Sequence, residues 1–266
     1  MDQQKYQNIE FSIVGGLATL VLNRPNRLNS FNAEMHIEVK TVLKQLSAKG
    51  AARCLLITGS GRGFCAGQDL SDRSVSGGDQ APDLSASIRD NYNPLIRAIT
   101  GLKMPVICAV NGVAAGAGAN IALACDIVIA GRSASFIQSF NKLGLVPDSG
   151  GTWMLPRLIG HARAMRLCLL GEKVSAVKAL EIGMISEVVE DADLLISASD
   201  MGRQLANAPT LGLALIKRAL FVSSSHSLDQ QLDLECELQG VAGRSDDYRE
   251  GVSAFMGKRA PKYQGC

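Results

Sequence analysis

The stretch PVICAVNGVAAGAGANIALACDIVIA, residues 105–130, decides the fold. Its two ends, 105–110 and 126–130, are short runs of β-branched and apolar residues bounded by turn residues, which is typical of buried strands. Between them, 117–125 is rich in Gly and Ala and long enough for a short helix. A strand, a glycine-rich loop, a helix and a second strand predict an α/β fold with parallel strands.

The same alternation continues toward the N-terminus. Cys54–Gly59, CLLITG, reads as a further buried strand. Residues 10–14 and 18–23 predict a hairpin that turns at Gly15 and Gly16. Asn32 is an N-cap residue for a helix that runs to about residue 48, and a second helix is predicted over 86–101.

From residue 174 onward, the periodicity predicts helices only. The expected helices cover 175–182, 191–208, 211–224, 228–242 and 246–256. We therefore expect two parts, a core over 1–190 that holds the site and a helical region over 191–266. The apolar face of the helical region must be covered by its own core or by another subunit. The turn-rich segment 71–83 is expected to be a surface loop.

The composition excludes several classes of protein. With 47% apolar residues in 266, intrinsic disorder is excluded. A net charge of +2 gives no field that would recruit nucleic acid or a membrane surface. Seven cysteines, scattered through mostly apolar runs, predict reduced thiols in a cytoplasmic protein. The three histidines lack metal-ligand spacing, so no metal site is expected.

Two loops follow predicted strands and can offer backbone N–H groups. They are GRGFCAGQDL, residues 61–70, and NGVAAGAGAN, residues 111–120. Neither matches the glycine spacing of a P-loop or a dinucleotide fold. Each loop alone could be no more than tight packing. Together, two strand-end donors can converge on one carbonyl oxygen and stabilise it as an enolate.

These segments resemble the crotonase (enoyl-CoA hydratase/isomerase) family. The similarity also covers NRPNRLNSFN (23–32), LGLVPDSGGTWMLPRLIG (143–160) and DYREGVSAFMGKRAPKY (247–263), so it runs nearly from end to end. It implies a ClpP-like spiral core of ββα units with a C-terminal helical trimerisation region, over 191–266, that also covers the site. It also implies an acyl-CoA thioester substrate, no external cofactor, and a homo-oligomer that is a trimer or a dimer of trimers.

The resemblance also assigns site residues. The family's oxyanion hole of two backbone N–H groups falls on Gln68 and Ala117. A basic residue near the last helix, Lys258 or Arg259, is expected to reach the CoA phosphates of a neighbouring subunit. The positions implied for coenzyme A and substrate are Arg27, Ala66, Gly67, Asp69, Leu70, Gly116, Asn120, Phe140 and Lys258.

The resemblance also shows which acid is present. Hydratases of the family use two glutamates to handle water, and those positions hold Asn120 and Phe140 here. Because neither side chain exchanges protons near neutral pH, we expect no ordinary hydratase chemistry. Asp148 occupies the position of the catalytic aspartate in the family's isomerases, although an Asp before a helix can also be only an N-cap. Cys65 has no histidine nearby and is expected to be a core residue.

The implied function is a cofactor-independent acyl-CoA isomerase. The chain is most similar to family members that convert ring-1,2-epoxyphenylacetyl-CoA to oxepin-CoA in phenylacetate degradation. Asp148 would move a proton while the oxyanion hole holds the thioester enolate. Two alternatives are an enoyl-CoA double-bond isomerase and a non-catalytic CoA-binding subunit.

Overall fold

The computed structural model describes residues 6–48, 52–73 and 83–266. A six-stranded sheet forms its centre, in the order β1-β2-β3-β5-β7-β10. The first two strands are the predicted antiparallel hairpin, and all later neighbours are parallel. The strands are β1 (Ile9–Val14), β2 (Leu17–Leu22), β3 (Cys54–Gly59), β5 (Val106–Val110), β7 (Ile127–Gly131) and β10 (Glu187–Val189).

A second sheet of four short strands lies beside the first, in the order β4-β6-β8-β9. Strands β3, β5 and β7 of the large sheet are each followed directly in the chain by a strand of the small sheet. This repeated passage, with helices between, confirms the predicted spiral core of ββα units. The short strands are β4 (Gly63–Cys65), β6 (Val113–Ala115), β8 (Ser135–Ile137) and β9 (Lys173–Ser175).

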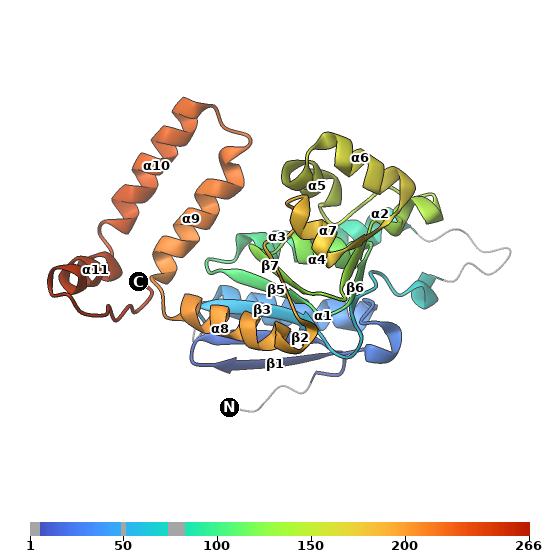
Figure 1. Cartoon of the computed structure of the whole chain (residues 1–266), viewed down its shortest axis with the longest axis horizontal. Helices are drawn as coiled ribbons and strands as arrows, with labels where there is room; N and C mark the ends of the chain where they lie inside the picture. The colour runs from blue at the N-terminus through green and yellow to red at the C-terminus, as the bar shows by residue number, and fades with distance from the viewer. Residues whose placement is uncertain (1–5, 49–51, 74–82) are drawn as a thin grey trace.

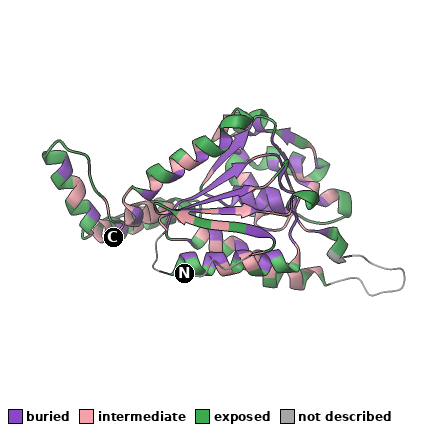
Figure 2. Ribbon diagram, turned by 90° about the horizontal axis from the view of Figure 1, so that it is seen from below, coloured by how far each residue is buried: buried purple, intermediate pink, exposed green. Residues whose placement is uncertain are grey.

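Both faces of the large sheet are buried, as expected for parallel strands that read as continuous apolar runs. Along β3, alternate side chains point to opposite faces. Leu55 and Ile57 join the main core with α1 (Ala33–Ser47) and α3 (Asn93–Gly101). Cys54 and Leu56 pack on the other face against α8 (Leu194–Ala206). Figure 2 shows the strands as the most buried part of the chain.

The remaining helices are α2 (Leu84–Ser87), α4 (Ala117–Leu123), α5 (Gly151–Ile159), α6 (His161–Leu170), α7 (Ala176–Glu181), α9 (Thr210–Ser223), α10 (Leu228–Ala242) and α11 (Asp246–Met256). Asn32 caps α1 as predicted, its side chain accepting a hydrogen bond from the Met35 N–H. The helices predicted over 228–242 and 246–256 match α10 and α11.

Two secondary-structure predictions were wrong. Strands β9 and β10 lie where helices only were expected, because three-residue strands are too short to show periodicity. The helix predicted over 86–101 is interrupted by a π-helical turn, η3 (Ile88–Tyr92), which separates α2 from α3. The strands β4, β6 and β8 were also not predicted. Most of the predicted loop 71–83 lies outside the described residues.

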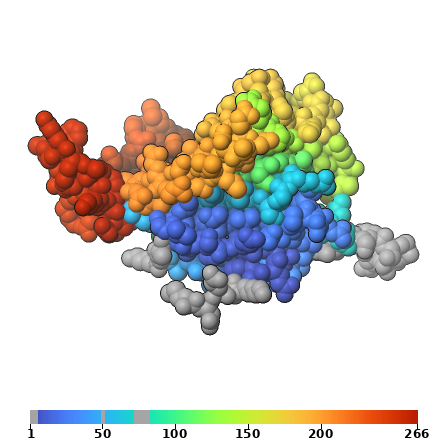
Figure 3. All heavy atoms as spheres, turned by 60° about the horizontal axis from the view of Figure 1, so that its bottom comes forward, coloured from blue at the N-terminus to red at the C-terminus, as the bar shows by residue number. Residues whose placement is uncertain are grey.

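Helices α9, α10 and α11 extend away from the sheets (Figures 1 and 3). Arg53 anchors their base to the core, donating to the Ala208 and Tyr263 carbonyls and to Thr210 Oγ1. Lys217 on α9 pairs with Asp126 at 2.9 Å. In contrast, α8 packs on the large sheet although the sequence groups it with the helical region. Helix α9 stays in contact with the core through Lys217 and through Phe221, whose ring stacks on that of Trp153. The part that projects therefore consists of α10 and α11.

Within the described residues, no single helix is both long and apolar enough to cross a membrane. The bent pair formed by 191–206 and α9 passes that test by length and composition only.

Candidate active site

The first predicted donor loop is held by main-chain hydrogen bonds. Phe31 N–H donates to the Gly67 carbonyl at 2.7 Å, and Asp69 N–H donates to the Phe31 carbonyl at 2.9 Å. These two bonds make a parallel bridge between Phe31 and Gln68. In such a bridge, the bonds come from the residues on either side of Gln68, so its own N–H points away from Phe31. That orientation suits a hydrogen-bond donor to a ligand.

The second loop approaches the first with almost no space between their backbones. A Cβ on Gly118 would lie 2.2 Å from the Cys65 carbonyl oxygen, and one on Gly67 would lie 3.4 Å from the Ala117 nitrogen. Only glycine therefore fits at residue 118. Gly67 also has a φ of +89°, which side chains disfavour. Gln68 and Ala117 are thus on neighbouring loops.

Ala117 is the first residue of α4, so its N–H has no carbonyl one turn earlier within the helix. Gly116 precedes it with a φ of +52° and donates its own N–H to the Ile137 carbonyl. The ring of Phe140, which is buried, lies 3.7 Å from where a Gly116 Cβ would be. Phe140 therefore lines the same loop as the Ala117 donor.

Asp148 lies beside the same helix. The Asn120 side-chain amide donates to the Asp148 carbonyl at 2.8 Å. Asn120 is three residues beyond Ala117, which is one turn, or about 4.5 Å along the axis. The Asn120 amide therefore ties the backbone of Asp148 to the helix that begins at Ala117. Ser149 Oγ donates to Asp148 Oδ1 at 2.8 Å.

Some predicted binding residues have structural partners. Asp69 is 6% exposed and pairs with Arg24 at 2.9 Å. The Ser71 hydroxyl, and then the Ser71 N–H and Arg24, hold the pKa of Asp69 below its usual value despite burial. Asn120 is fully buried with both ends of its amide bonded. Its predicted contact with substrate does not fit this geometry.

Other predicted positions lie around the loops or far from them. Arg27 is exposed beside Leu28, whose carbonyl accepts the Ala66 N–H, and Leu70 is exposed after Asp69. Lys258 follows α11, at the opposite end of the molecule from α5 and α6 (Figure 1). The contact of Lys258 with the coenzyme A of a neighbouring subunit stays a prediction.

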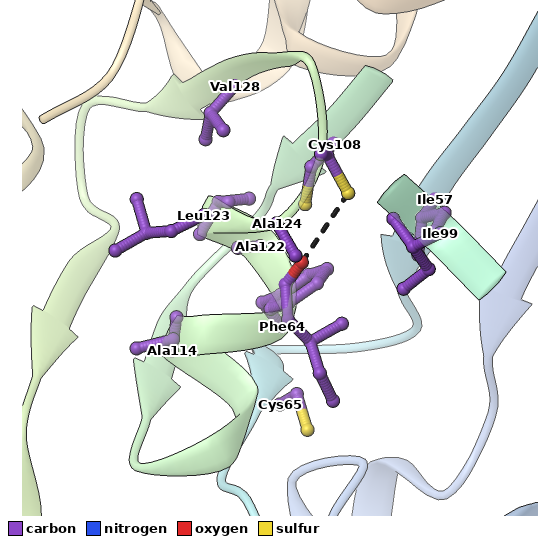
Figure 4. Close-up of a cluster of buried hydrophobic side chains, with 14 of the residues drawn as sticks. Ile57, Phe64, Cys65, Ile99, Cys108, Ala114, Ala122, Leu123, Ala124 and Val128 are labelled. Atoms are coloured by element: carbon purple, nitrogen blue, oxygen red, sulfur yellow. Dashed lines mark hydrogen bonds between the residues drawn. The ribbon is translucent and has the colours of Figure 1, made fainter. Parts of the chain in front are cut away.

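Cys65 is confirmed as a core residue. It is fully buried, and burial raises its pKa to about 12, so it stays a thiol. Figure 4 shows Cys65 and Cys108 among apolar side chains that include Phe64, Ala122 and Val128. No three His, Cys, Asp or Glu side chains of the described residues gather closely enough to hold a metal ion.

Sequence reasoning missed Tyr92, which is buried and donates its hydroxyl to Gln68 Oε1 at 2.9 Å. It is the last residue of the π-helical turn η3. No local signal could have found it, because its partner is 24 residues away in the chain. Gln138, which donates to Asn120 Oδ1 at 2.8 Å, was missed for the same reason.

Known proteins similar to this chain point to one family. The family model Enoyl-CoA hydratase/isomerase matches residues 12–266. The chain is 58% identical to 1,2-epoxyphenylacetyl-CoA isomerase of Escherichia coli strain K12, over 94% of this chain and 95% of the relative. It is 35% identical to trans-2-decenoyl-[acyl-carrier-protein] isomerase of Streptococcus mutans, over 98% of this chain and 99% of that one.

A solved structure is similar along the whole chain. The crystal structure of an enoyl-CoA hydratase from Bacillus anthracis superposes with a TM-score of 0.90 at 32% identity, covering 98% of this chain and 100% of that one. The fold, the two donor loops and the family match agree with one another. The chain belongs to the enoyl-CoA hydratase/isomerase family.

Proposed function

We propose that this chain is an acyl-CoA isomerase that converts ring-1,2-epoxyphenylacetyl-CoA to oxepin-CoA without an external cofactor. The observation that carries the proposal is Asp148, a carboxylate tied through Asn120 to the helix that begins with the Ala117 N–H. The relative at 58% identity bears the name of this epoxide isomerase.

The Gln68 and Ala117 N–H groups hold the thioester carbonyl, which acidifies the neighbouring CH₂. Asp148 removes one proton from that carbon, and the electron pair of the broken C–H bond moves into the enolate. As the three-membered ring expands, the bond between the two epoxide carbons breaks and its electron pair joins the double bonds of the seven-membered ring. The enolate pair forms the double bond outside that ring and displaces one ring π pair onto the ring carbon that is then protonated. The same carboxyl returns the proton to a ring carbon, so no atom is gained or lost.

Asn120 and Phe140 replace the two carboxylates that the family's hydratases would use. Neither residue can activate water near neutral pH. Phe140 instead places the edge of its ring beside Gly116, next to the Ala117 donor. The site therefore favours moving a proton within the substrate over adding water to it.

The test is deuterium exchange at the α-carbon of phenylacetyl-CoA in D₂O, followed by mass spectrometry. Wild type should exchange, and Asp148→Asn should exchange about 10³-fold more slowly because a general base contributes about that much. Its dissociation constant for the thioester should stay within about threefold, because the amide keeps the shape. Asp193→Asn, an exposed residue far along the chain, is the matched control. Near-normal exchange in Asp148→Asn would show that another group is the base.

The alternative reaction is a double-bond shift in a straight-chain enoyl thioester. The 35% identical decenoyl isomerase favours it, because an enolate with one proton shuttle serves both reactions. Values of kcat/KM on the epoxide and on a 3-enoyl-CoA separate the two. A catalytically idle CoA-binding subunit would turn over neither the epoxide nor the 3-enoyl-CoA.

The C-terminal region 191–266 is proposed to join subunits into a trimer or a dimer of trimers. Support comes from exposed apolar side chains on α11, where Phe255 is 83% and Met256 77% exposed. They border a groove of about 410 Å³ between α9 and α11. In that assembly, Lys258 would reach a neighbour's coenzyme A. Light scattering with Phe255→Ser should show smaller particles than wild type.

We propose that the protein is cytoplasmic. Its seven cysteines form no disulfide, which fits the reducing cytoplasm that the sequence predicts.

A further inference from the structure

The buried side-chain amides of Gln138 and Asn120 are hydrogen-bonded in series to the main-chain carbonyl of Asp148. Gln138 Nε2 donates to Asn120 Oδ1 at 2.8 Å, and Asn120 Nδ2 donates to the Asp148 carbonyl at 2.8 Å. Asn120 is completely buried and Gln138 is 4% exposed. Because Asn120 has its acceptor facing one partner and its donor facing the other, its amide can take only one orientation.

The main-chain carbonyl oxygen of Asp148 accepts two hydrogen bonds. It accepts the Gly151 N–H at 2.9 Å as well as the Asn120 amide, which satisfies both lone pairs. The amide also fills the space over Gly151, where a Cβ would lie 2.3 Å from Asn120 Nδ2. The turn that carries the carboxylate is therefore held by hydrogen bonds and by direct packing.

The turn itself adopts a conformation that needs such support. Ser149 has a φ of +51°, in the left-handed region that residues other than glycine disfavour. Such backbone persists where the surroundings hold it in place. Ser149 is 2% exposed and its hydroxyl donates to Asp148 Oδ1, so the backbone of the turn and the direction of the carboxylate are linked.

We propose that Asn120 is a positioning residue for Asp148, and that the hydrogen bond from Gln138 holds the other end of the Asn120 amide in place. Asn120 acts on the reaction through the Asp148 carbonyl, without touching the substrate. The inference rests on the proposed role of Asp148 as the base. It explains why a buried amide stands where hydratases of the family carry an acid.

The test compares Asn120→Asp with Asn120→Ala. The Asp variant keeps the size of the side chain but places a carboxylate oxygen against the Asp148 carbonyl. Both variants should lower kcat about 100-fold, since a misplacement of about 1 Å costs that much, while KM changes less than about threefold. Gln138→Leu, which removes only the outer bond, should lower kcat about tenfold.

Asn141→Ala is the matched control. Asn141 also donates to a carbonyl, that of Leu169 at 2.9 Å, and also packs against a glycine, Gly171. It should lower the unfolding temperature by a similar amount and leave kcat within about twofold, because no bond links it to Asp148. If Asn120→Asp keeps kcat, or if Asn141→Ala lowers it equally, the positioning role is wrong.

Asp148→Asn is measured in parallel to separate the two hypotheses. Full activity in Asp148→Asn would show that Asp148 is not the base, and it would overturn the positioning role of Asn120 as well. An inactive Asp148→Asn beside a fully active Asn120→Asp would overturn the positioning role alone. An unfolding temperature for Asn120→Asp close to that of Asn141→Ala, with the kcat loss confined to the former, supports it.

Discussion

The two sides of the site are built in different ways. On the donor side, the loops around Gln68 and Ala117 are joined mainly through main-chain atoms and glycines. On the acid side, the Asp148 turn is held by the side chains of Asn120 and Ser149. The donor side should therefore tolerate changes of side chain and reject an added Cβ, while the acid side should be sensitive to changes in the side chains of Asn120 and Ser149.

The largest effect is expected for Gly118→Ala. The new methyl group would lie 2.2 Å from the Cys65 carbonyl oxygen, so the two loops must separate. Overpacking of this kind costs about 3 kcal/mol of unfolding free energy. Because one oxyanion donor is worth about 10²–10³ in rate, kcat should fall by at least that much. Urea denaturation and steady-state kinetics measure the two losses.

Gly101→Ala is its control, because nothing lies within 4 Å of a Cβ there and the φ angle is ordinary. It should change neither quantity appreciably. A Gly118→Ala enzyme with normal turnover would mean that the close approach of the loops does not set the donor geometry.

The second effect concerns Asp69, where a side chain does hold the donor loop. Its pKa is lowered mainly by the Ser71 hydroxyl, with help from Arg24, so the folded state favours the charged form. The stabilisation is complete above the unfolded value of about 3.9 and disappears as pH falls through the folded pKa. Asp69→Asn should lose about 2 kcal/mol at pH 7.

Denaturation across pH 2–7 checks this sign. Wild type should lose stability below about pH 4 more steeply than Asp69→Asn, so the two curves converge in acid. Parallel curves would show that Asp69 titrates alike in the folded and unfolded chains.

The smallest effect is expected for Gln68→Ala. The backbone N–H remains, so kcat should stay within about fivefold, although loss of the Tyr92 bond should cost about 1 kcal/mol of stability. Tyr92→Phe breaks the same bond from the other side and should behave alike. A 100-fold loss of kcat in Gln68→Ala would show that the donor side also depends on a side chain, as the acid side does.

The long apolar strands and the well-capped helices could be predicted from the sequence, because periodicity and the Asn32 cap are local signals. The strands of the small sheet could not, since three residues carry no period. The donor loops were predicted from their glycines at strand ends, whereas Asp148 and the donors Gln68 and Ala117 came from the family resemblance. The roles assigned to these residues stay predictions. Tyr92 and Gln138 reach partners 24 and 18 residues away, which no local pattern encodes.

The π-helical turn that ends at Tyr92 makes the site sensitive to the deletion of a single residue. A π turn bonds each residue to the fifth one along instead of the fourth, so it behaves like an α-helix with one residue inserted. Deleting one residue within 88–92 would restore regular winding and rotate what precedes it by about 100° relative to α3. The tyrosine or the preceding segment would then lose its register with the first loop. A change of chain length here, with no change of chemistry, would alter how the loop is supported.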